Sequence, residues 1–150
     1  MKQGKPARPW VIALVIVAGL AIIAGGWWNA ERRAAKARET TAIAARMQAI
    51  VDEFQAGLPR QYAQGLVLDR VAFEGSNLVM TIRSTNRKAS QAGPDLVQVA
   101  QAEKALMLPL CEQPDVLFLL ARNVNITRRF VDGDGAEFFE ITLTSADCAR

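Results

Sequence analysis

Residues 124–144, VNITRRFVDGDGAEFFEITLT, decide the fold of the C-terminal part of this chain. Two runs rich in apolar and β-branched residues flank the sequence Asp-Gly-Asp-Gly at 132–135. Asp-Gly pairs between apolar runs are strong signals of a tight β-hairpin. The sequence therefore predicts strands over 124–131 and 137–144, with Phe139, Ile141 and Leu143 on one face of the second strand.

A second hairpin is predicted upstream, over residues 65–73 and 78–84. Its turn is the sequence Glu-Gly-Ser-Asn at 74–77, a composition that favours tight turns. In the second of these strands, Leu78, Met80 and Ile82 alternate with polar or smaller residues, as expected for a strand with one buried face.

Helical segments are predicted between the two hairpins. Residues 95–108 have apolar side chains at helical spacing, and residues 116–122 follow Pro114 as a short helix. The side chains expected on the packed face of the longer helix are Leu96, Val99, Ala102 and Leu106. This order of elements predicts an α+β domain over 58–150, a helix-hairpin-helix-hairpin domain whose four-stranded antiparallel sheet carries helices on one face.

The N-terminal part has a different character. Residues 10–28, WVIALVIVAGLAIIAGGWW, contain no charge and would span roughly 28 Å as a helix, close to the thickness of a bilayer core. Trp10, Trp27 and Trp28 bracket this stretch, and indole rings prefer the membrane–water interface. The sequence predicts a transmembrane helix over 10–28, preceded by a tail at 1–9.

The apolar stretch is predicted to be an uncleaved signal-anchor. It is longer than the core of most signal peptides, and cleavage near Ala24 would leave two tryptophans at the new N-terminus. A cleaved signal peptide is the alternative. Basic residues flank the stretch on both sides, so flanking charge does not decide its orientation.

The chain has two cysteines, Cys111 and Cys148. An even number of cysteines in a small exported domain indicates a disulfide bond, whereas two free thiols in a cytosolic domain are the alternative. We therefore expect a single-pass protein of a bacterial inner membrane. Its N-terminus would be cytoplasmic, and residues 30–150 would lie in the periplasm.

A juxtamembrane helix is predicted over 29–57. Its larger apolar side chains recur every three or four residues and so share one face. That face is expected to pack on the chain's own domain, with a partner helix as the alternative. The residues of this predicted partner face are Ile43, Met47, Ile50 and Phe54.

From residue 58 to residue 148 the chain resembles a type of small, generally uncharacterised membrane-anchored protein of proteobacteria. The shared pattern begins with Leu58-Pro59 after a helix and continues with a hairpin and Cys111 before a short helix. It ends with a last hairpin that closes on Asp147-Cys148. The resemblance implies a disulfide-closed periplasmic α+β domain on a single-pass anchor, and it implies no catalytic residue.

The sequence offers little for catalysis, and we expect neither an enzyme nor a cofactor. It contains no histidine, which excludes the commonest general base and nearly all zinc sites, and it contains no phosphate-binding glycine motif. Asp132, Asp134 and Glu137 are the best candidates for a metal site. Because these acids share one tight turn, a hairpin turn is favoured over a calcium loop, and no metal is expected.

Four basic side chains are candidates for binding an anion, namely Arg83, Arg87, Lys88 and Arg128. All 15 acidic residues and all but three of the 18 basic residues follow the apolar stretch, so residues 30–150 carry no net charge. This balance disfavours nucleic-acid binding, and we expect no nucleic acid as a partner.

These observations predict a membrane-anchored, non-enzymatic accessory protein. Its periplasmic domain would be presented to a membrane or envelope protein complex as an accessory subunit. The alternative is a membrane-tethered sensor or binding module that recognises an anionic envelope ligand through its basic loops.

Overall fold

The computed structural model describes residues 9–149, with side chains described from residue 26 onward. The chain divides into two units, Met1–Ala45 and Arg46–Arg150. Helix α1 (Pro9–Gln55) begins in the first unit and ends in the second. Each unit is described by itself.

In the first unit, the side chains of α1 that are described are almost all exposed. Trp27 and Trp28 are among them, and the guanidinium of Arg32 lies 5.1 Å from the centre of the Trp28 ring. No helix within the described residues is long and apolar enough to cross a membrane. The predicted transmembrane helix over 10–28, with Trp10, has most of its side chains outside the described part and stays a prediction.

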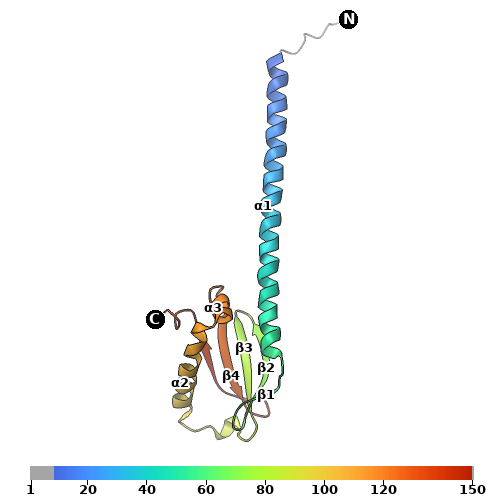
Figure 1. The fold of residues 1–150 in the computed structure, drawn as a ribbon. Coiled ribbons are helices and arrows are strands. Elements are labelled where there is room, and N and C mark those ends of the chain that lie inside the picture. Colours follow the sequence, from blue (N-terminus) through green and yellow to red (C-terminus); the bar gives the residue numbers. More distant parts are fainter. Residues whose placement is uncertain (1–8, 150) are drawn as a thin grey trace. The chain divides into compact units, whose positions relative to one another are not determined.

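The second unit is an α+β domain built on a five-stranded sheet (Figure 1). The strands lie in the order of the chain: β1 (Arg60–Ala63), β2 (Leu66–Glu74), β3 (Asn77–Ser84), β4 (Asn125–Val131) and β5 (Glu137–Leu143). The helical elements between β3 and β4 are η1 (Ala89–Gln91), α2 (Leu96–Met107), η2 (Leu108–Glu112) and α3 (Pro114–Leu120). The α+β class is confirmed.

Both predicted hairpins are present. Strands β2 and β3 pair antiparallel around the turn at Gly75, which has a φ of 60°. Strands β4 and β5 also pair antiparallel, with Phe130 opposite Phe139. Both strand boundaries lie within one residue of those expected for the last hairpin.

The predicted four-stranded antiparallel sheet is wrong in two respects. Strand β1 is an additional fifth strand, paired antiparallel with β2. Strands β3 and β4 run parallel, so the sheet is mixed. The physical reason is the helical connection through α2, η2 and α3, which returns the chain to the end of the sheet where β3 began, as a crossover does.

The core lies between one face of the sheet and the helices. From the sheet it takes Leu78, Ile82, Ile126 and Leu143, which are fully buried. From the helices it takes Met107 of α2 and Leu119 of α3, with Ile50 and Val51 near the end of α1. The opposite face carries ion pairs between its strands, including Arg83 with Asp69 and Arg129 with Glu74.

The predicted partner face of α1 contacts the chain's own domain where it falls in the second unit. Ile50 is buried in the core, and Met47 and Phe54 are half-buried against it. Ile43 is half-buried and belongs to the first unit. Ile50, Met47 and Phe54 therefore do not form a free partner surface.

Candidate functional site

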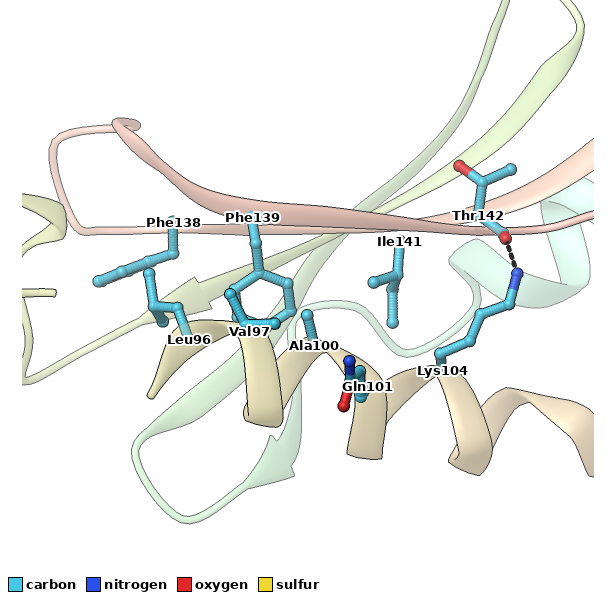
Figure 2. A pocket seen from close by; sticks show the side chains of 9 residues that line it. All are labelled: Leu96, Val97, Ala100, Gln101, Lys104, Phe138, Phe139, Ile141 and Thr142. Carbon is cyan, nitrogen blue, oxygen red and sulfur yellow. Dashed lines mark hydrogen bonds between the residues drawn. The ribbon is translucent and has the colours of Figure 1, made fainter. Parts of the chain in front are cut away.

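An apolar groove lies between α2 and β5, and its volume is about 560 Å³. Helix α2 contributes Leu96, Val97 and Ala100, and β5 contributes Phe138, Phe139 and Ile141. Figure 2 shows these side chains projecting from the helix and the strand into the space between them. Because β5 is the last strand of the sheet, the groove lies at a sheet edge, a common site of protein recognition.

Helix α2 packs on a face that the sequence did not predict. Leu96, Ala100 and Met107 are directed to the domain, with Met107 fully buried. Val99, Ala102 and Leu106, which were expected in the core, are exposed, so the predicted packing face is wrong apart from Leu96. The helix consequently presents apolar side chains to solvent, with Val97 65 % and Leu106 63 % exposed.

Phe138 and Phe139 line the groove on the sheet side, and further aromatic rings pack behind Phe139. The rings of Phe139 and Phe130 are stacked with their centres 4.5 Å apart. Tyr62 meets Phe130 edge-on at 6.0 Å. Stacked and edge-on ring pairs have preferred geometries, so these contacts hold the Phe139 ring in place at the groove.

The groove ends where α2 and β5 are linked. Lys104 of α2 donates hydrogen bonds to the carbonyl oxygen of Thr142 and to Oδ2 of Asp147, the latter at 2.8 Å. Asp147 Oδ2 also accepts from the backbone N–H of Thr144 at 2.7 Å. Just beyond, Cys111 and Cys148 form the predicted disulfide, which is confirmed.

Asp147 has a depressed pKa. The hydrogen bond from Lys104, then that from the backbone N–H of Thr144, lowers its pKa from 3.8 to about 2. The charged carboxylate is therefore stabilised in the folded state. The stability that this carboxylate gives to the fold is fully present above pH 4 and is lost as the pH falls through about 2.

We expect Asp147→Asn to lower the free energy of unfolding at pH 7 by about 1 kcal/mol, since the side chain is partly solvated. The difference between the variant and the wild type should shrink as the pH is lowered from 4 towards 2. Urea unfolding across that pH range measures it. A difference that grows on acidification would contradict the role given to this carboxylate.

A polar cluster links α2 to strands β1 and β4. Tyr62 of β1 donates to Oε2 of Glu103 on α2 at 2.8 Å, and Arg128 of β4 donates to the Tyr62 hydroxyl at 2.8 Å. Arg128 also pairs with Glu103 at 3.4 Å. Burial, followed by the bond to Glu103, raises the pKa of Tyr62 to about 12, so the phenol stays protonated.

The four predicted anion-binding residues do not form one site. Arg83 pairs with Asp69 on the face away from the helices, and Lys88 pairs with Asp134 at 2.7 Å. Arg87 is exposed and has no ion pair among the described residues. Arg87 and Lys88 line a cavity of about 370 Å³ beside α2, whereas Arg128 lines another one.

The side chain of Asp132 stabilises the acidic turn at 132–135 by hydrogen bonds to the backbone. Asp132 accepts hydrogen bonds from the backbone N–H groups of Ala89, Asp134 and Ala136. These hydrogen bonds lower the pKa of Asp132, and the bond from Ala89 has the largest effect. No group of metal-binding side chains occurs in the part of the chain that the structure describes.

No protein-family model matches this sequence, and no curated protein does. Two solved structures share the fold. A "putative secreted protein" from Pseudomonas aeruginosa is 16 % identical with a TM-score of 0.56, and the match covers 72 % of this chain and 94 % of that one. The pilotin EpsS of the Vibrio vulnificus type 2 secretion system is 19 % identical with a TM-score of 0.50, and the match covers 68 % of this chain and 87 % of that one.

Proposed function

We propose that this chain is a non-enzymatic accessory protein of the bacterial cell envelope. Its α+β domain would bind an apolar segment of a membrane or envelope protein in the groove between α2 and β5. The observation that carries this proposal is the apolar groove between α2 and β5, at whose rim Val97 is 65 % exposed. Exposed apolar surface at a groove is typical of protein-binding sites.

The likeness to a pilotin supports the same class of function. That protein belongs to a secretion system, and it shares the fold of this domain at low sequence identity. We propose that this domain also serves a multiprotein complex of the envelope. The groove, rather than the fold, supplies the argument for where the partner binds.

We expect Val97→Glu to weaken binding of the partner by more than tenfold. The change places a carboxylate at the edge of an apolar groove, where burial without a counter-charge is unfavourable. Because Val97 is 65 % exposed, the free energy of unfolding should stay within about 0.5 kcal/mol of the wild type. Co-purification of the partner after crosslinking in cells measures the loss.

The matched control is Leu117→Glu. Leu117 lies on α3, is 46 % exposed and does not line the groove, so the same change of apolar to acidic should leave binding intact. Equal losses in the two variants would assign the partner to another surface.

We further propose that the domain is periplasmic and that residues 10–28 anchor it in the inner membrane. The disulfide supports this location, because such bonds persist in oxidising compartments. The resemblance to membrane-anchored proteobacterial proteins agrees with it.

Thiol labelling tests the location. With the outer membrane permeabilised, a membrane-impermeant maleimide should label Cys111 and Cys148 after reduction and leave them unlabelled without reductant. A cytoplasmic thiol and a periplasmic thiol serve as controls for the intact inner membrane. Labelling that requires breaching the inner membrane would contradict the proposed orientation.

A further inference from the structure

A separate cavity of about 300 Å³ lies over the helix-bearing face of the sheet. It is surrounded by the end of α1, strand β1 and η2, and Leu68, Met80 and Ile82 of the central strands form its floor. Two of its lining residues, Arg60 and Arg128, are cationic. No Asp or Glu is among the described residues that line it, so the cavity combines apolar walls with positive charge.

Arg128 is a buried cation with an incomplete set of hydrogen bonds. Its side chain is 12 % exposed, and its Nη1 donates to Tyr62 and Glu103. Nε is buried and has no acceptor among the described residues, and the two hydrogen bonds given for the side chain both use Nη1. A buried donor without an acceptor is unfavourable. Binding of an acceptor at the Nε–Nη2 edge of the guanidinium would therefore be favourable.

The free edge has a defined chemical preference. The Nε and Nη2 groups of an arginine point the same way and match the two oxygens of a carboxylate. Glu103 lies 3.4 Å from Nη1 and offsets part of the charge, which disfavours a dianion such as phosphate. The apolar floor suits a hydrocarbon chain or ring.

We propose that this cavity binds a small monocarboxylate with an apolar chain. The carboxylate would pair with Nη2 of Arg128, and with Nε after a small rotation of the side chain uncovers it. The chain would lie on Leu68, Met80 and Ile82. Arg60 is exposed and has no ion pair among the described residues, so it adds favourable charge at the rim. This site does not depend on the groove between α2 and β5.

The test is titration of the full chain with octanoate, followed by calorimetry and by backbone amide NMR shifts. We expect saturable binding, with shifts at Met80, Ile82 and Arg128, and much weaker binding of octan-1-ol, which lacks the carboxylate. Arg128→Lys keeps a charge beside Glu103 but removes the two-donor edge, and should weaken octanoate binding about tenfold.

Arg60→Gln serves as the variant that leaves the fold intact, because Arg60 is exposed. It should weaken octanoate binding about threefold, whereas Arg87→Gln, which removes the same charge away from this cavity, should have no effect. Val97→Glu should also leave octanoate binding unchanged, which separates this site from the partner groove. Equal binding of octanoate and octan-1-ol, no binding, or shifts confined to other residues would overturn the proposal.

Discussion

Replacing both Cys111 and Cys148 with alanine should lower the free energy of unfolding by about 4 kcal/mol. The disulfide closes a loop with a sequence separation of 37 residues, and the chain-entropy model gives a stabilisation of this size for such a loop. Domains of this size are stable by about 5–15 kcal/mol in total, so the bond supplies a large share. Urea unfolding of the double variant and of the oxidised wild type measures the difference.

The location of the disulfide gives this result a structural meaning. It joins the chain just beyond α2 to the chain just beyond β5, the two elements that form the groove. The wild type treated with reductant is the control, since it removes the same bond without changing the sequence and should unfold like the double variant. A loss of less than about 1 kcal/mol would contradict the stabilising role.

A second large loss of stability, about 2–5 kcal/mol, is expected for Ile126→Ala. Ile126 is fully buried in β4, opposite Leu78 of β3 and Leu143 of β5. The truncation removes apolar contacts at the centre of the sheet and leaves a cavity that rigid neighbours on both sides cannot close. Urea unfolding measures the loss.

Two variants control for the chemistry of this change. Ile126→Val removes one methylene group and should lower the free energy of unfolding by about 1 kcal/mol. Val97→Ala shortens an exposed side chain and should change it by less than about 0.5 kcal/mol. If Ile126→Ala were as mild as Val97→Ala, β4 would not be a central strand.

The hairpins could be predicted because their signals are local. The turns at Gly75 and at 132–135 interrupt alternating strands, and each hairpin pairs residues that are close in sequence. Strand β1 gave no such signal, because its sequence Arg-Gln-Tyr-Ala has no apolar alternation and three of its four residues are exposed. The parallel pairing of β3 and β4 depends on how the intervening helices pack. No local sequence pattern indicates this packing.

The candidate sites were only partly accessible from the sequence. Apolar residues occur on several sides of α2, so its spacing did not distinguish the packed Ala100 and Met107 from the exposed Val99 and Leu106. Arg128 was recognised as an anion-binding candidate, but it was grouped with Arg83, which lies on the other face of the sheet. Burial of Arg128 beside Tyr62 depends on β1, the strand that the sequence did not reveal.

The most direct test of the partner groove is photocrosslinking in intact cells. A photoreactive amino acid would replace Val97 on α2 in one strain and the exposed Arg70 on β2 in another. Mass spectrometry would identify the products. The proposal predicts one dominant envelope protein crosslinked from position 97, with yield lost when Phe138→Glu is added, and no such product from position 70. Equal products from both positions, or none from position 97, would contradict it.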